Sequence, residues 1–336
     1  MVRGIALDSV LITGVNGFIG SALCAKMLFD GWTVRGTVRN AQHSNLLPPN
    51  LEPIIIESIG SDIDWSKALN GVDSVVHLAA LIHLKDNSGA DQFRKFRYIN
   101  TVATEHLART AATSGCRRFI FLSSVKVNGE EKAKPYTEKD IPKPIDPYGI
   151  SKWEAEKLLH KISAETGMEV VIIRPPMVYG PNVKANFLLL FKVVERGIPL
   201  PMTSINNRRS FIYLGNLIDA VVTCIKHPKA SGQTYFVSDG EDVSTPELIQ
   251  RISYSLGKPT RLFPFPPVML KIAGIITGKT VTIDRLLHSF SIDCSKISNE
   301  LNWKAPFTME QGLRETAQWY KERRQKSGVR DQKLVT

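Results

Sequence analysis

Leu11-Ile12-Thr13-Gly14-Val15-Asn16-Gly17-Phe18-Ile19-Gly20 is the stretch of sequence that decides the fold. A short apolar run opens into glycines spaced three and three, and the helical pattern Ser21–Asp30 follows. Glycine lets the backbone turn tightly and approach a pyrophosphate, whose charge the first amides and the dipole of a helix then stabilise. A strand, a glycine turn and a helix in this order predict a dinucleotide-binding unit, although a glycine-rich turn can also be purely structural.

Strand-like apolar runs alternate with helical stretches up to about residue 176. This alternation predicts a parallel sheet covered by helices on both faces, which is an α/β fold of the Rossmann type with a doubly wound sheet. One helix is expected over 98–113 and another over 147–166, with Asp146 as N-cap, Pro147 at the first position and Gly167 at the end. The expected strands cover residues 10–13, 33–38, 53–56, 74–78, 118–122 and 169–173.

The chain divides into three expected regions. Residues 1–176 form the dinucleotide-binding domain, to which 210–240 return, and 177–320 form a smaller substrate-binding lobe. Residues 321–336 are expected to be a frayed basic tail. In the lobe, 262–278 is apolar and rich in proline, and we expect a packed helix and turn there; the alternative is a contact with a membrane.

The composition of the 336-residue chain, with 43% hydrophobic and 22% charged residues, is typical of a globular protein. The net charge is +11, and the last sixteen residues hold six Lys/Arg against two Asp/Glu. We expect a cytoplasmic protein with no stable membrane insertion and no nucleic-acid partner, whose basic excess suits anionic small ligands. The four cysteines are scattered without a C-x-x-C pair, so no metal site is expected.

Tyr148 and Lys152 lie four residues apart at the start of an expected helix, so their side chains share one face. A nearby ammonium favours phenolate and would lower the pKa of Tyr148 toward working pH, where proton transfer is most efficient. Such a pair also occurs by chance on surface helices. Ser123 and Ser124 follow the apolar run 119–122 and bring hydroxyls to the carboxyl end of a strand, where open parallel sheets bind their ligands.

Taken together, these motifs resemble the extended short-chain dehydrogenase/reductase family, and within it the enzymes that modify nucleotide-diphosphate sugars. The resemblance covers nearly the whole chain. It rests on Gly14-x-x-Gly17-x-x-Gly20, His77-Leu78-Ala79-Ala80, Asn100, Ser123-Ser124, Tyr148-x-x-x-Lys152 and Arg174-Pro175-Pro176-Met177-Val178-Tyr179-Gly180-Pro181.

The resemblance implies a role for each matching residue. Ser124 would bind the reacting sugar oxygen, Tyr148 would exchange the proton, Lys152 would hold the nicotinamide ribose while acidifying the tyrosine, and Asn100 would brace the catalytic site. The dinucleotide would contact Gly14, Gly17, Phe18, Ile19, Gly20, Arg39, Ser58, Ile59, Leu78, Ala79, Ala80, Ser123, Tyr148, Lys152 and Pro175.

The implied substrate is a nucleotide-diphosphate sugar, expected to be linked to UDP. Besides Ser124, its contacts would come from Asn186, Phe187 and Arg209, and Arg285 is a further candidate that could equally be a plain surface arginine. Relatives often dimerise through the helices that carry Asn100 and Tyr148, which implies a homodimer.

The end of the second expected strand bears on the choice between NAD and NADP. An acidic residue at this point would bind the ribose 2′-hydroxyl of NAD, but the segment Thr33-Val34-Arg35-Gly36-Thr37-Val38-Arg39-Asn40 has no carboxylate. Arg39 can pair with a 2′-phosphate and Arg35 adds charge nearby, so NADP(H) is favoured and NAD(H) is the alternative. Arg39 could also be only a solvated residue at a strand end.

Use of NADP favours a reduction, because a reductase needs an exchangeable reduced coenzyme whereas a 4-epimerase returns the hydride that it removes. Segments 123–130, 175–181 and 183–187 also resemble bacterial 4-ketoreductases. This implies NADPH-dependent reduction of the C4 ketone of a UDP-4-keto-6-deoxy sugar, of the UDP-N-acetylquinovosamine type, in surface polysaccharide biosynthesis.

Two other functions stay open: an NAD-dependent UDP-glucose or UDP-N-acetylglucosamine 4-epimerase with the same residues, and a non-catalytic dinucleotide-binding sensor. The chain departs from the pattern of its relatives at Asn128 and Met177, where the sugar or its nucleotide is expected to lie.

Overall fold

The computed structural model describes residues 9–40, 47–82, 90–132, 134–278 and 280–332. Its larger part is a seven-stranded sheet in the order β3-β2-β1-β4-β5-β6-β9, and every pairing in it is parallel. The strands are β1 (Ser9–Thr13), β2 (Thr33–Val38), β3 (Glu52–Ile55), β4 (Ser74–His77), β5 (Arg118–Leu122), β6 (Glu169–Arg174) and β9 (Thr234–Phe236). The predicted Rossmann-type fold is confirmed, and the predicted strand ends differ from these by a residue at most.

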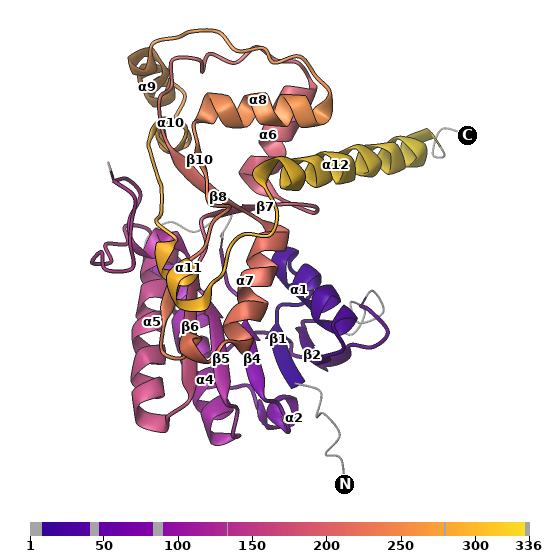
Figure 1. Cartoon of the computed structure of the whole chain (residues 1–336), viewed down its shortest axis with the longest axis vertical. Helices are drawn as coiled ribbons and strands as arrows, with labels where there is room; N and C mark the ends of the chain where they lie inside the picture. Colours follow the sequence, from indigo (N-terminus) through magenta and orange to yellow (C-terminus); the bar gives the residue numbers. More distant parts are fainter. Residues whose placement is uncertain (1–8, 41–46, 83–89, 133, 279, 333–336) are drawn as a thin grey trace.

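Helices cover both faces of this sheet (Figure 1). On one face, Val10 and Ile12 of β1 belong to a core shared with α1 (Phe18–Phe29) and α7 (Leu214–Lys226). On the other face, Leu11 belongs to a core shared with α2 (Ser66–Leu69), α4 (Ala103–Thr113) and α5 (Pro147–Thr166). Successive residues of a strand point to opposite faces, so a strand buried on both sides is apolar throughout.

The order of the strands reverses at β1, whose neighbours are β2 on one side and β4 on the other. In an open parallel sheet, ligands bind outside the carboxyl ends of the strands at such a reversal. The glycine turn follows β1 at this point, so the fold places it at the position where a dinucleotide is expected.

The helix predicted over 98–113 begins earlier than expected. The chain is helical from α3 (Ala90–Arg97), passes through a π-helical turn at Tyr98–Val102 and continues as α4. Most of α3 is polar, so its sequence carried little apolar periodicity to indicate a helix.

A smaller part lies above the main sheet in Figure 1. It is built on a three-stranded sheet in the order β10-β8-β7, formed by β7 (Met177–Tyr179), β8 (Arg209–Tyr213) and β10 (Asp242–Val243). Four helices join it: α6 (Ala185–Glu195), α8 (Thr245–Leu256), α9 (Pro267–Ile276) and α10 (Thr280–Leu287). Helix α11 (Ser295–Leu301) packs against β9 of the main sheet.

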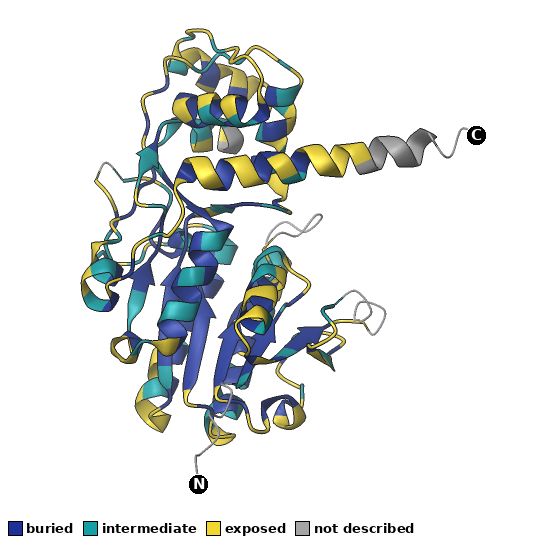
Figure 2. Ribbon diagram, turned by 45° about the vertical axis from the view of Figure 1, so that its right-hand side comes forward, coloured by how far each residue is buried: buried dark blue, intermediate teal, exposed yellow. Residues whose placement is uncertain are grey.

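The C-terminal helix α12 runs from Met309 to Gln332, so the prediction of a frayed tail from residue 321 is wrong for its first twelve residues. Figure 2 shows α12 projecting beyond the smaller part, with buried and exposed residues alternating along it. Tyr320 and Arg324 both bind Glu195 at the end of α6, which fixes this stretch of the helix. Among the described residues, no helix is long and apolar enough to cross a membrane.

Candidate active site

The glycine turn is so tightly closed that it requires glycine. Gly14 has a φ of +76°, and its carbonyl accepts a hydrogen bond from the Gly17 amide at 2.9 Å. A Cβ atom on Gly20 would lie 2.2 Å from the Gly14 carbonyl oxygen, which no side chain can occupy. The turn therefore brings the N-terminus of α1, with Phe18 and Ile19, directly against the end of β1.

A hydrogen-bonded chain connects this turn to the loop after β4. The Thr13 hydroxyl accepts from the amides of Leu78 and Ala79, both at 3.1 Å, and lies 2.8 Å from Nδ1 of His77. The other ring nitrogen of His77 lies 2.9 Å from the Thr104 hydroxyl. Burial, with a smaller effect of the Lys152 charge, lowers the pKa of His77 to about 3, so the imidazole is neutral and structural.

Asn100 is buried in the π-helical turn and holds two segments together. Its carbonyl accepts from the Leu81 amide at 2.8 Å, and its amide donates to the Leu81 carbonyl at 2.9 Å and to the Ser151 hydroxyl at 3.0 Å. The Ser151 hydroxyl in turn donates to the Tyr148 carbonyl at 2.8 Å. Asn100 therefore ties the loop after Leu78, Ala79 and Ala80 to the first turn of α5.

The start of α5 is held as its sequence predicted. The Asp146 carboxylate accepts from the Gly149 amide at 2.6 Å, Pro147 is the first helical residue, and Gly167 ends the helix with a φ of +76°. This N-cap fixes Tyr148 in the first turn, where its side chain lies close enough to that of Ser124 for the hydroxyl to lower the pKa of the phenol. The Ser124 hydroxyl also accepts from the Lys126 amide at 3.2 Å, so it caps a short helix and remains at the carboxyl end of β5.

Lys152 lies one turn further along the same face of α5. Its ammonium donates to the Leu122 carbonyl at 2.8 Å and sits 4.3 Å from the centre of the Phe121 ring. Four residues further on, the buried Glu156 accepts from the Ser123 hydroxyl at 2.5 Å and forms a salt bridge with the buried Arg174. The structure thus brings Ser124, Tyr148, Lys152 and Asn100 together, as the resemblance implied.

The pKa values at the site differ from the sequence-based expectation. Burial raises the pKa of Tyr148 well above its usual range, the nearby Asp146 charge raises it further, and the bond with Ser124 only partly opposes both. Burial also lowers the pKa of Lys152 to about 7, although the Glu156 charge acts in the opposite direction. The expected lowering of the Tyr148 pKa by Lys152 is therefore absent here, because burial outweighs the effect of a neighbour that holds its own charge weakly.

The other expected dinucleotide contacts lie at the same edge of the sheet, but the side chains of two residues expected near the coenzyme are held by other groups. Arg39 is exposed directly after β2, Ser58 and Ile59 follow β3, and Pro175 follows β6. Arg35 was expected to add charge near Arg39, but its guanidinium binds Glu52 at 2.8 Å and the Asn70 carbonyl at 2.5 Å. Arg35 lies four residues before Arg39, which is about 13 Å along an extended strand, so it does not add charge beside Arg39.

Ser123 is the second of these residues. Its hydroxyl is buried against Glu156, so only its backbone can face a dinucleotide. Asn128 was expected near the sugar, but it is also buried, and its carbonyl accepts from Arg174 at 3.1 Å. Met177 is partly exposed at the start of β7.

The expected substrate residues lie on the smaller part. Arg209 of β8 is half-buried and donates to the carbonyls of Arg285 and, at 3.3 Å, His288. Arg285 lies 4.0 Å from Glu130, so two arginines and one carboxylate gather here. Burial and the Arg285 charge lower the pKa of Arg209.

Phe187 differs from the other candidates because its ring packs in the core, stacked 5.1 Å from the ring of Tyr179. Only its backbone is left to contact a ligand, beside the exposed Asn186. The preceding Ala185 has a φ of +54°, a conformation that costs energy for any residue but glycine.

A hollow of about 650 Å³ lies between α1 and α7, and of the expected site residues it is lined by Phe18. Its lining is mostly apolar and includes Phe18, Leu214 and Phe307. Because none of the four catalytic candidates lines it, we do not assign the reaction to it.

Several residues that organise the site were not predicted individually. Thr13, Thr104, Glu156 and Arg174 support it through buried hydrogen bonds. The i, i+4 spacing of Lys152 and Glu156 could have indicated that they share a face of α5. The partners from distant segments could not be read from the sequence.

The fold and the site together define an enzyme of the extended short-chain dehydrogenase/reductase class. Residues 10–238 match the NAD dependent epimerase/dehydratase family, and the chain belongs to this family. It is 42% identical to a UDP-glucose 4-epimerase of Vibrio cholerae over 316 residues, which cover 92% of this chain and 94% of that protein.

A more distant relative is the N-acetyl-alpha-D-glucosaminyl-diphospho-ditrans,octacis-undecaprenol 4-epimerase of Escherichia coli O157:H7. It is 29% identical over 93% of this chain and 95% of its own length. Among solved structures, a UDP-glucuronic acid 4-epimerase from Bacillus cereus in complex with NAD superposes with a TM-score of 0.76. It is 24% identical over 94% of this chain and 97% of that chain.

The residues at the carboxyl edge fit a nicotinamide dinucleotide. The Gly14–Gly20 turn leaves no room for a side chain and directs the N-terminus of α1 outward, which suits a pyrophosphate. Such a coenzyme supplies hydride transfer when bound. The chain's own residues supply binding, positioning and the movement of the proton.

Proposed function

We propose that this chain is a 4-epimerase of a UDP-linked sugar, UDP-glucose or UDP-N-acetylglucosamine, that works with a retained NAD. The observation that carries the proposal is the placing of Tyr148 and Lys152 on one face of α5, beside Ser124 at the carboxyl edge of the sheet. The 42% identity to a UDP-glucose 4-epimerase, over nearly the whole of both chains, supports the choice of reaction.

In the proposed reaction, the phenolate form of Tyr148 accepts the proton of the sugar 4-hydroxyl as C4 is oxidised and returns it when C4 is reduced from the opposite face. Ser124 donates a hydrogen bond to the same oxygen. Lys152 stabilises the phenolate, and Asn100 keeps the first turn of α5 in place. Arg209 and Arg285 would bind the diphosphate, whose charge matches their own.

The reaction predicts a clear result for Tyr148→Phe. The variant loses the proton carrier but keeps the ring, so turnover of UDP-glucose should fall by about 10²-fold or more while dinucleotide binding is retained. NMR of the sugar C4 stereochemistry measures turnover, and coenzyme titration measures binding. Near-normal turnover would refute the assignment of Tyr148.

A second candidate is the NADPH-dependent reduction of a UDP-4-keto-6-deoxy sugar in surface polysaccharide biosynthesis. It is favoured by the exposed Arg39 after β2, in a segment with no carboxylate to bind the ribose 2′-hydroxyl of NAD. The same four catalytic residues would serve, with Tyr148 donating the proton to the C4 oxygen.

Identification of the coenzyme separates the two candidates. Protein purified without added coenzyme is denatured, and the released dinucleotide is identified by mass spectrometry. Retained NAD together with epimerisation of UDP-glucose supports the first proposal. Consumption of NADPH in the presence of a UDP-4-keto sugar supports the second candidate if Arg39→Asp weakens it. A bound dinucleotide with no turnover of either sugar indicates a sensor.

Two further properties remain proposals. We propose a homodimer through the helices that carry Asn100 and Tyr148. Tyr98 and Val102 of the π-helical turn are exposed there, and light scattering of the purified chain tests the proposal. A cytoplasmic location is also a prediction.

A further inference from the structure

Helix α9 carries an apolar face that the described residues do not cover. Its outward residues are Val268, Met269, Ile272, Ile275 and Ile276, and their exposed fractions range from 44% for Ile272 to 79% for Ile276. Positions 268, 272, 275 and 276 follow the helical repeat, so these side chains form one continuous stripe. Folded proteins rarely expose a stripe of this kind without a partner.

The opposite face of α9 explains why the helix is ordered in this position. Leu270 and Gly274 are buried, and a Cβ atom on Gly274 would lie 3.0 Å from Ile283 of α10. Close packing on α10 therefore anchors the helix, and the outer stripe adds nothing to the internal core. The predicted packed helix is present, but it is packed on one side only.

The charge of the surrounding segment indicates what the stripe would contact. Between Gly257 and Asp284 the sequence has four basic residues and no acidic one. Lys271 lies within α9 and is exposed, and Arg261 is exposed in the loop between α8 and α9. An apolar stripe whose own segment of the sequence carries only basic charges complements a surface of hydrocarbon below anionic headgroups.

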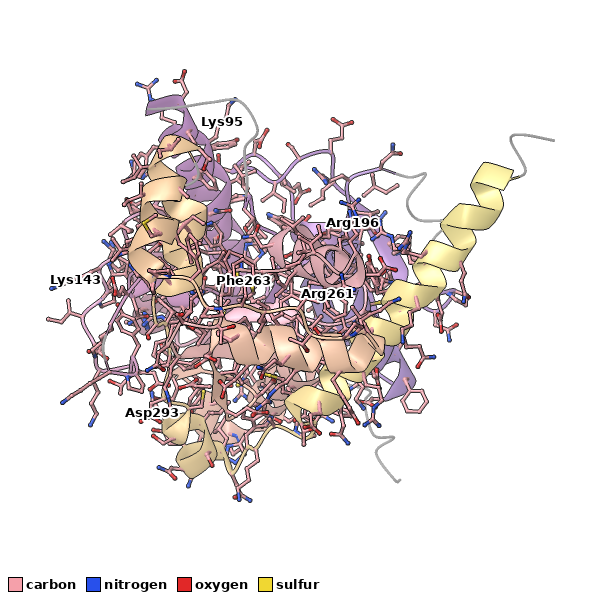
Figure 3. The ribbon with its side chains drawn as sticks, turned by 90° about the horizontal axis from the view of Figure 1, so that it is seen from above. Lys95, Lys143, Arg196, Arg261, Phe263 and Asp293 are labelled. Carbon is pink, nitrogen blue, oxygen red and sulfur yellow. The ribbon has the colours of Figure 1, made fainter. Side chains whose placement is uncertain are left out.

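Further basic and apolar residues lie in the loop before α9 and at the end of α6. Figure 3, the view from above, labels Phe263 and Arg261 of that loop and Arg196. Arg261 donates to the Gly197 carbonyl at 3.1 Å, which places it beside the end of α6. Phe263 is 41% exposed, so a second apolar group accompanies the basic side chains.

We propose that α9 and the adjoining loop bind the surface of an anionic membrane, with α9 lying in the plane of the interface. A helix of ten residues is about 15 Å long, too short to span a bilayer but sufficient to place its apolar stripe at the boundary of headgroups and acyl chains. Helix α10 connects this surface to Arg285, so the membrane would lie close to the substrate residues. The inference does not depend on which reaction the enzyme catalyses.

The test is flotation of the full chain with vesicles. One set contains phosphatidylcholine alone and a second set contains phosphatidylcholine with phosphatidylglycerol. We expect binding to the anionic vesicles at low salt, weaker binding to the neutral ones, and release as salt is raised. Absence of flotation with the anionic vesicles would overturn the proposal.

Variants locate the contact. I275S/I276S should weaken binding about tenfold or more, and Lys271→Glu about fivefold. The matched control is F29S/I141S, which removes two equally exposed apolar side chains elsewhere and should bind like the wild type. Equal weakening by the control would contradict a role of α9.

A second copy of the chain is the competing occupant of the stripe. Sedimentation without vesicles distinguishes it: a dimer that I275S/I276S converts to a monomer, with flotation unchanged, overturns membrane binding. Urea unfolding of each variant verifies that these surface changes leave the fold intact.

Discussion

The free energy of unfolding should increase as the pH rises above neutral, because the buried ammonium of Lys152 then loses its proton. Burial lowers the pKa of its ammonium to about 7 in the folded chain, whereas the unfolded chain keeps an ordinary value of about 10.4. Between these values the unfolded chain binds one proton more, so the free energy of unfolding increases with pH. Below both pKa values, Lys152 is charged in the folded and in the unfolded chain, so the full cost of burying the ammonium remains. From about pH 6 to about pH 9.5, the gain works out at about 3 kcal/mol.

Urea unfolding at these two pH values measures the effect. Lys152→Met removes the titrating group while filling its space, and the other titrating groups are common to both proteins. Tyr148 does not interfere in the folded state, because burial raises its pKa above this window. The wild type should gain about 3 kcal/mol more than the variant as the pH is raised. An equal gain in both proteins would refute the assignment of a buried, weakly protonated lysine.

Three further substitutions test the site. Gly20→Ala places a Cβ 2.2 Å from the Gly14 carbonyl oxygen. The dissociation constant of the dinucleotide, measured by calorimetric titration, should therefore rise about tenfold or more. An unchanged constant would contradict a tight turn at the coenzyme. Asn100→Ala leaves the Leu81 backbone without its partner, which should cost about 1–3 kcal/mol of unfolding free energy and lower turnover more than coenzyme affinity. Glu156→Gln leaves the Arg174 charge buried and should cost about 3–5 kcal/mol in urea unfolding, and an effect no larger than that of the exposed control Glu165→Gln would contradict it.

The main sheet could be predicted because its signals are local. Each strand of the parallel sheet is a short apolar run, and α5 is bounded by residues whose conformational preferences are strong: Asp146, Pro147 and Gly167. The glycine turn was predictable for the same reason, since its spacing follows from contacts within ten residues.

The direction of each side chain could not be predicted in the same way. Ser123 and Ser124 are neighbours in sequence, yet one hydroxyl is buried against Glu156 and the other accepts from the Lys126 amide and lies near Tyr148. Arg35 is held by Glu52 and by the carbonyls of Ala68 and Asn70 at the end of α2, contacts that only the folded chain forms. The exposed stripe of α9 was not predicted. An apolar sequence indicates that a helix is buried, but it does not show whether the chain itself or a partner covers the helix.

The proton affinity of the site shows the same limit most clearly. The spacing of Tyr148 and Lys152 places them on one face of α5. Burial, however, sets their pKa values and favours the neutral form of each side chain. What opposes this for Lys152 is the charge of Glu156, one turn further along the helix. Ser123, directly after β5, and Arg174, at the end of β6, both bind the Glu156 carboxylate. The charge state of Lys152 therefore depends first on burial and then on a carboxylate outside the motif, held in place by residues that come together only when β5 and β6 pair.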